Sequence, residues 1–172
     1  MFHYVIKRAK EHEFPVTIHV GTVGLPASSL DIKGRYQGIN PLNIANLLEI
    51  YPDVNFVLLH GGYPWTNEAV CLAFQKWRKN VYIDIGPGSG NISKHGTQSI
   101  LSDLIATNGG GRIMWGGDVS GAEGAYGTLS IVKDVIARVL SEYVDDKVMS
   151  MKNAIYLAEG ILSKNAQKIF KT

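Results

Sequence analysis

The chain has 172 residues, the usual length of one domain, and 45% of them are hydrophobic. Its formal net charge of +2 and single cysteine argue against a nucleic-acid-binding protein, a disordered chain and a disulfide framework. No apolar run approaches the roughly 20 residues that span a bilayer, and no signal peptide is visible. We therefore expect a cytoplasmic globular protein with no nucleic-acid and no membrane partner.

Short apolar segments alternate with helical patterns along the chain. A segment from about residue 3 to residue 12 is predicted to be a helix. Four β-branched or aromatic segments next to glycines then indicate buried strands: Pro15–Val20, Val54–His60, Asn80–Ile85 and Arg112–Trp115. Apolar residues at helical spacing predict helices near 44–51, 69–77, 100–105 and 129–140, with one or two more in 148–170.

This alternation predicts an α/β fold in a single domain over residues 1–172. Strands that are continuously apolar and separated by helices are typical of parallel sheets covered on both faces. Two architectures fit, an open doubly wound sheet or part of a (β/α)8 barrel. A complete barrel needs about 250 residues, and four strands cannot close one.

Three of the four strand ends carry a residue that can bind a metal ion. His19 and His60 lie at the ends of the first and second predicted strands, and Asp118 follows the fourth after two glycines. Each residue alone has an ordinary explanation, such as a hydrogen-bonded histidine or an aspartate in a turn. Ligands bind beyond the carboxyl ends of parallel strands, however, so we expect the three side chains to share one cavity.

Three further residues are weaker candidates. Asp84 points to the opposite side of its strand from Ile83 and Ile85, and therefore faces either a barrel interior or a loop. Arg35 and Tyr36 lie in the long polar connection after the first strand, from which they could reach a substrate. A solvated loop is the simpler interpretation of that connection.

Five segments occur in an order that resembles a known family: residues 16–21, with His19; 57–64, with His60; 81–85, with Asp84; 113–118, with Asp118; and the terminal Asn165–Phe170. Over almost its whole length the chain resembles the C-terminal half of an amidohydrolase-related (amidohydrolase family 2) metal-dependent hydrolase of TIM-barrel fold. The resemblance implies parallel (β/α) units that form strands five to eight of the barrel.

The resemblance also implies a mechanism and site residues. His19 corresponds to a metal ligand on strand five, and His60 to a strand-six histidine that binds a second metal or positions substrate and water. Asp118 corresponds to the strand-eight aspartate that binds metal and accepts the proton of the attacking water. Zinc is the first choice of divalent metal, with manganese or iron as alternatives. The expected reaction is hydrolysis of C–N or related bonds in a small molecule, with Arg35 and Tyr36 as substrate contacts.

The His-x-His pair of strand one and the lysine of strand four have no counterpart here. We therefore expect a fragment, or a half-length product, that pairs with the missing half-barrel or forms an oligomer. Alternation counted back from His60, Asp84 and Asp118 predicts that the barrel interior is faced, and left exposed, by four apolar residues: Phe56, Leu58, Tyr82 and Met114. Two other functions stay open: non-oxidative decarboxylation in the same superfamily, and a non-catalytic half-barrel that only binds.

Overall fold

The computed structural model describes residues 2–21, 40–75, 79–86, 92–107 and 110–171. Its strands are parallel and form one sheet in the chain order β1–β2–β3–β4. The strands are short: β1 (Val16–Ile18), β2 (Phe56–Leu58), β3 (Val81–Asp84) and β4 (Ile113–Met114). Because each strand pairs with its sequence neighbour, the sheet is half of a TIM barrel, and the doubly wound alternative is excluded.

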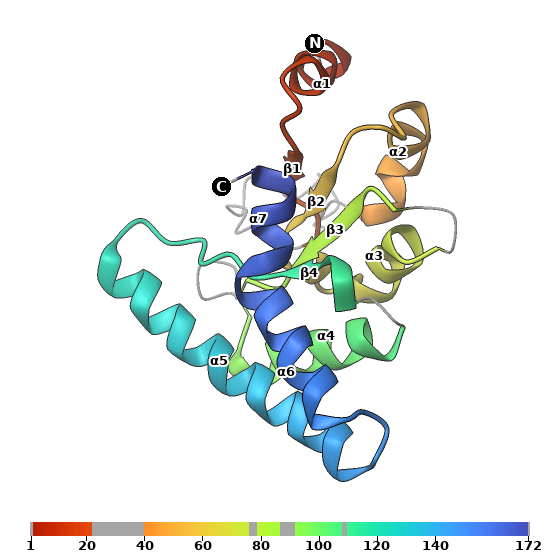
Figure 1. Cartoon of the computed structure of the whole chain (residues 1–172). Helices are drawn as coiled ribbons and strands as arrows, with labels where there is room; N and C mark the ends of the chain where they lie inside the picture. Colours follow the sequence, from red (N-terminus) through yellow and green to blue (C-terminus); the bar gives the residue numbers. More distant parts are fainter. Residues whose placement is uncertain (1, 22–39, 76–78, 87–91, 108–109, 172) are drawn as a thin grey trace, which may run out of the picture.

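Helices precede, separate and follow the strands (Figure 1). Their bounds are α1 (Phe2–Glu11), α2 (Ala45–Ile50), α3 (Thr66–Ala73), α4 (Lys94–Ala106), α5 (Ala122–Asp145), α6 (Met151–Glu159) and α7 (Asn165–Phe170). Serine side chains cap two of them, since Ser93 accepts a hydrogen bond from the Gly96 amide and Ser150 from the Asn153 amide. The helices predicted from apolar spacing are all present.

The outer face of the sheet holds the main core. Phe56 and Leu58 of β2 pack there with Val81, Ile83 and Ile113 of the neighbouring strands, all of them 0% exposed. The prediction that Phe56 and Leu58 face the barrel interior is therefore wrong. β2 ends at Leu58, and the chain then turns sharply, so alternation counted back from His60 does not hold.

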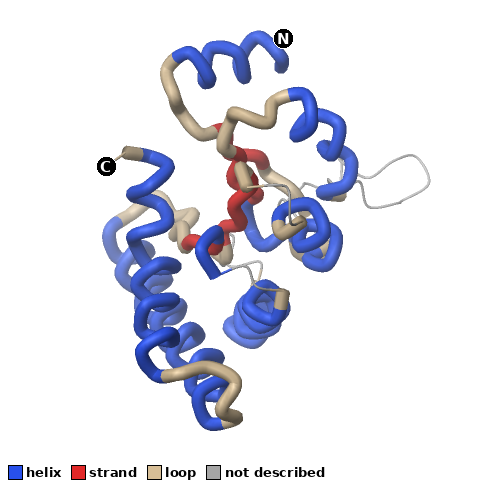
Figure 2. Tube along the Cα trace, turned by 45° about the vertical axis from the view of Figure 1, so that its right-hand side comes forward, coloured by secondary structure: helices blue, strands red, loops and turns tan. Residues whose placement is uncertain are grey.

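The inner face carries the opposite set of strand residues, and α7 covers it. Val57, Tyr82 and Met114 form a second cluster with Ile169 of α7, and each is at most 4% exposed. Figure 2 shows α7, near the C-terminus, on the other side of the strands from α2 and α3. Tyr82 and Met114 face the interior as predicted, but they are not exposed to solvent, because the chain's own C-terminal helix packs on them.

The free edge of β4 is also covered from within the chain. The Asn165 Nδ2 group donates to the carbonyl oxygens of Ile113, at 2.7 Å, and Gly110, at 3.1 Å. The Trp115 amide donates to the Ile161 carbonyl at 3.0 Å, within the π-helical segment Gly160–Lys164 that joins α6 to α7. The C-terminal segment thus satisfies backbone groups that a further strand would otherwise pair.

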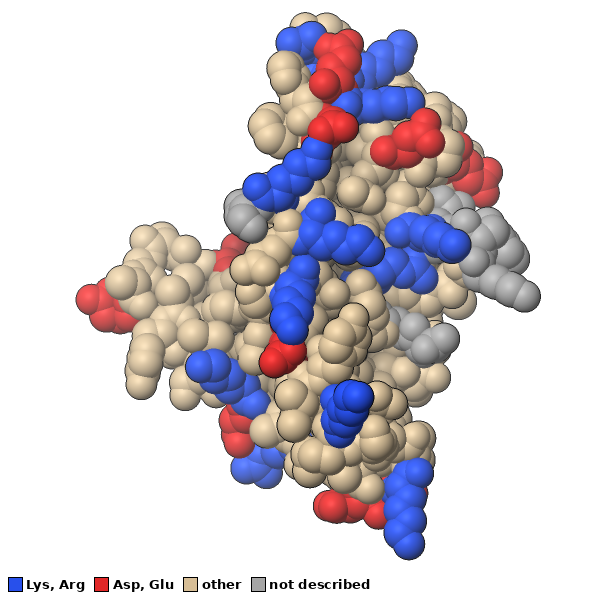
Figure 3. Space-filling view, viewed as in Figure 1, with Lys and Arg blue, Asp and Glu red and all other residues tan. Residues whose placement is uncertain are grey.

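Charged side chains of both signs are mixed on the surface. Figure 3 shows Lys and Arg along the middle of one face, with Asp and Glu among them. Several of these charges are paired: Lys10 with Asp53, Lys164 with Glu159 and Lys171 with Glu13. In the described part of the chain, no helix is both long and apolar enough to cross a membrane.

Replacing Asn165 tests the attachment of the C-terminal segment. Asn165→Ala leaves the carbonyl oxygens of Ile113 and Gly110 without this donor in a buried setting, and we expect the free energy of unfolding to fall by about 1–3 kcal/mol. Urea denaturation measures the change. Gln167→Ala is the matched control, because Gln167 lies on the same helix and is exposed. Equal stability of the two variants would contradict this role for Asn165.

Candidate active site

The turn after β2 places His60. The segment Leu59–Gly62 begins as soon as the strand ends, and His60 and Gly61 both have positive φ, at 60° and 61°. A Cβ on Gly61 would lie 2.5 Å from Cγ2 of Ile100, so the turn can pack on α4 only with glycine at this position. The reversal brings the His60 side chain to the inner face of the sheet, where it is 4% exposed.

The three sequence-predicted residues His19, His60 and Asp118 lie together at the carboxyl ends of the strands. The Nε2 atom of His60 is 3.2 Å from Nδ1 of His19 and 4.0 Å from Oδ2 of Asp118. The two imidazole rings are tilted by 41° with centroids 5.1 Å apart. One buried nitrogen is therefore flanked by a second imidazole and by a carboxylate that is partly open to solvent.

His60 and Asp118 line a cavity of about 220 Å3, whereas His19 contacts His60 without lining that cavity. His60, Asp84 and Asp118 provide its charged or titratable lining, and Thr17 of β1 adds a hydroxyl. The rest of the wall is largely apolar and comes from both the strands and the C-terminal helix: Val57, Leu59, Met114, Trp115, Ala166 and Phe170. A mostly apolar hollow with a few converging polar groups is the usual form of a small-molecule site.

The protonation of His60 is set by its burial. Burial lowers the pKa of the His60 imidazole, as does the nearby His19, while the Asp118 carboxylate raises it; the net shift is downward. The ring is therefore neutral at pH 7, the state that can bind a metal ion or accept a proton. Its Nδ1 atom is buried and has no partner within normal hydrogen-bond geometry among the described residues.

Asp84 lies deeper in the same cavity and is 5% exposed. Burial raises the pKa of its carboxyl group to about 7, although hydrogen bonds from the backbone of Gly86, Gly116 and His60 oppose that shift. Asp84 thus lies on the barrel interior and also contacts loops, so both interpretations of the sequence hold. The signal for its importance was present in the alternation of β3, but its partners come from distant loops.

Two predicted site residues cannot be placed. Arg35 and Tyr36 lie outside the described residues, so their role as substrate contacts stays a prediction. Trp115 enters the cavity wall instead, and its Nε1 atom is buried with no hydrogen-bond partner in the described part of the chain.

The donor set partly fits a metal ion. Two nitrogens bound at 2.0–2.1 Å to one tetrahedral ion lie roughly 3.3 Å apart, close to the 3.2 Å between His19 and His60. Within the described ranges, however, no group of three or more His, Cys, Asp or Glu is arranged to hold a metal. The spacing of the two histidines thus suits two positions of a metal-ligand shell.

Comparison with known proteins decides the family. The profile of the family described as "Amidohydrolase" matches residues 2–172, which is nearly the whole chain. The chain belongs to the amidohydrolase family. This confirms the resemblance drawn from the five ordered segments, and it supports an enzyme of hydrolase or lyase type in broad terms. Members of this superfamily generally use divalent metal ions, although the comparison identifies neither the metal nor its ligands.

Individual relatives agree with this amidohydrolase fold. Protein FluG of Emericella nidulans is 29% identical over 133 residues, which are 77% of this chain and 15% of FluG. A uronate isomerase from Thermotoga maritima superposes with a TM-score of 0.78 at 17% identity, covering 96% of this chain and 39% of its own. An uncharacterised TIM-barrel protein from Bordetella bronchiseptica superposes with a TM-score of 0.59 at 21% identity, and the match covers 98% of this chain and 50% of that protein. The chain thus spans half or less of each relative.

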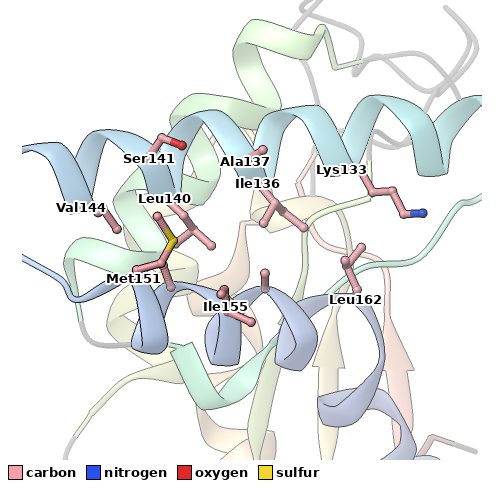
Figure 4. A pocket seen from close by; sticks show the side chains of 11 residues that line it. Lys133, Ile136, Ala137, Leu140, Ser141, Val144, Met151, Ile155 and Leu162 are labelled. Atoms are coloured by element: carbon pink, nitrogen blue, oxygen red, sulfur yellow. The ribbon is translucent and has the colours of Figure 1, made fainter.

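A second hollow of about 220 Å3 lies away from this candidate site, between α5 and α6. Figure 4 shows apolar side chains from both helices facing one another across it, among them Ile136, Leu140 and Ile155. Lys133 and Ser141 are the polar side chains of its lining, so it contains no metal ligand and no catalytic pair.

The neighbours of His60 should move its pKa in opposite directions. In the metal-free chain, NMR titration of the His60 ring is expected to give a midpoint below 6.5. Asp118→Asn should lower that midpoint further, and His19→Ala should raise it. A lowered folded-state pKa also means that the contribution of His60 to stability is present above pH 6.5 and is lost as the pH falls through the folded-state value. Shifts of the same sign in both variants would contradict the geometry.

Proposed function

We propose that the chain forms half of the barrel of a metal-dependent hydrolase that cleaves C–N or related bonds of a small molecule. One observation carries the proposal. In an amidohydrolase-family chain, a buried, neutral imidazole nitrogen of His60 lies 3.2 Å from a second imidazole and 4.0 Å from a carboxylate, beside a cavity at the strand ends.

The residues have separate roles in this reaction. His19 and His60 hold the divalent ion, with zinc as first choice and manganese or iron as alternatives, because neutral imidazoles suit these metals. When bound, such an ion lowers the pKa of water to about 7 and polarises the scissile bond. Asp118 is a carboxylate at the cavity rim, so it accepts the proton that the attacking water releases. The apolar wall holds the substrate and excludes bulk water.

Metal binding should depend on the two histidines. Titration calorimetry of the purified chain with zinc alone is expected to show binding, and His19→Ala and His60→Ala should each weaken that binding more than about tenfold. A loss of about tenfold is already typical when a residue that only supports a ligand is replaced, so loss of a ligand itself should cost at least as much. His95→Ala is the control, because His95 is exposed and lies on α4, away from the cavity.

The result decides between two classes of function. Retained zinc affinity in both site variants would contradict the assigned ligands. A wild-type chain with no affinity for zinc, manganese or iron would favour a non-catalytic half-barrel that only binds. Assays of full-length protein with amides, lactones and aromatic carboxylates then distinguish hydrolysis from non-oxidative decarboxylation.

The remaining metal ligands belong, in this proposal, to a second half-barrel, either a separate polypeptide or a second copy. The edge of β4 is engaged by Asn165 and Ile161, whereas β1 lies at the opposite edge of the sheet. The Val16 amide donates to Asn55 next to β2, so by the alternation of a parallel strand the Thr17 amide points outward. A partner strand therefore pairs with β1.

Pairing through β1 should be sensitive to one backbone amide. Sedimentation velocity of the wild-type chain is expected to show a species of twice the chain mass, and Thr17→Pro should convert it to monomer by removing the outward N–H. Thr17→Val is the matched control, since it keeps the amide and nearly the same shape. A well-folded wild-type monomer at all concentrations would rule out self-pairing, and a dimer that persists in Thr17→Pro would rule out the β1 edge.

A further inference from the structure

Asp84 ends β3, and its carboxyl group receives backbone N–H groups from three different strand ends. Its Oδ1 atom accepts hydrogen bonds from the amide of Gly86, at 2.9 Å, and from the amide of Gly116 after β4, at 2.6 Å. The backbone N–H of His60, after β2, also faces the carboxyl group and lowers its pKa. Neighbouring β/α units are therefore connected through one side chain.

The glycines on either side allow this close approach. A Cβ on Gly116 would lie 3.2 Å from Oδ1 of Asp84, tighter than an ordinary contact. A Cβ on Gly86 would lie 3.0 Å from Oδ2 of Asp84 and 2.3 Å from the Gly116 carbonyl oxygen, which no backbone could tolerate unmoved. The two loops can close around the carboxylate only because neither glycine has a side chain.

The loops held in this way carry two residues of the proposed site in a costly conformation. His60 has φ of 60°, and Asp118, two residues after Gly116, has φ of 45°. Both values lie in the left-handed region that residues other than glycine adopt rarely, so the surrounding structure must hold them there. Asp84 contacts the backbone of His60 itself and the backbone two residues before Asp118.

A packing role alone does not explain a carboxylate in this position. Burying the group costs free energy, which several backbone donors offset, whereas an apolar residue would fill the space without that cost. We propose that Asp84 is a positioning residue that fixes the loops carrying His60 and Asp118 so that their side chains converge. The inference rests on the proposed function for the identity of the site.

Asp84→Asn is the sharpest test, because it keeps the shape and replaces one acceptor oxygen with a donor. We expect the amides of Gly86 and Gly116 to exchange hydrogen at least tenfold faster, and the ring nitrogens of His60 to shift in NMR spectra of the metal-free chain. Zinc affinity should fall by at least tenfold. Gly116→Ala adds a methyl group that displaces the same loop from the carboxylate. This variant should produce the same pattern although Asp84 itself is unchanged.

Thr97→Ala is the control for a general loss of stability. Thr97 is 1% exposed on α4, and its hydroxyl bonds to the Ser93 carbonyl, remote from the cavity. It should lower the melting temperature and leave the His60 ring signals unchanged. Unchanged His60 signals and amide exchange in Asp84→Asn would overturn the inference, as would identical changes in Thr97→Ala.

The same experiment separates this inference from the proposed function. If the wild-type chain binds no zinc, the proposed function fails, but the amide exchange and the His60 ring signals still decide the role of Asp84. If zinc binds with equal affinity in wild type and Asp84→Asn, the positioning role fails and the metal site stands.

Discussion

A single amide side chain connects the C-terminal helices to the last strand of the sheet. Asn165 is buried and donates to two carbonyl oxygens at the start of β4, one of them on the open edge of that strand. This contact fixes where α7 begins, and α7 then places Ile169 on the inner face of the sheet. Without this helix, the apolar residues of that face would meet water, which is costly for a sheet of only four strands.

The position of α7 also determines where a ligand can enter. Its apolar side chains cover the inner face near Val57, Tyr82 and Met114, while the strand ends above them stay open as the cavity beside His60. Ala166 and Phe170 of α7 contribute to the wall of that cavity. The same helix thus stabilises the sheet and shapes the hollow in which the chemistry is proposed to occur.

The parallel strands could be predicted because each is a short apolar run next to glycine and helices separate them. Their order followed only from the family resemblance, since such runs fit both a doubly wound sheet and a barrel. The meeting of His19, His60 and Asp118 followed from their equal places at the strand ends. The faces of β2 could not be assigned in this way, because His60 lies beyond the strand, in a left-handed turn that breaks the alternation. The covering by α7 and the partners of Asp84 depend on contacts between residues far apart in sequence, for which periodicity gives no signal.

The C-terminal end of the chain lies beside the segment that leads into β1. Lys171, the last but one residue, forms an ion pair with Glu13, just before β1, and Figure 1 shows both termini at the end of the sheet where the strands begin. His60 and Asp118 lie at the opposite end, where the strands finish. Because Phe170 of α7 also lines the cavity, this one short helix spans from the ion pair below β1 to the wall beside His60, and a disturbance at Glu13 or Lys171 would reach the cavity through it.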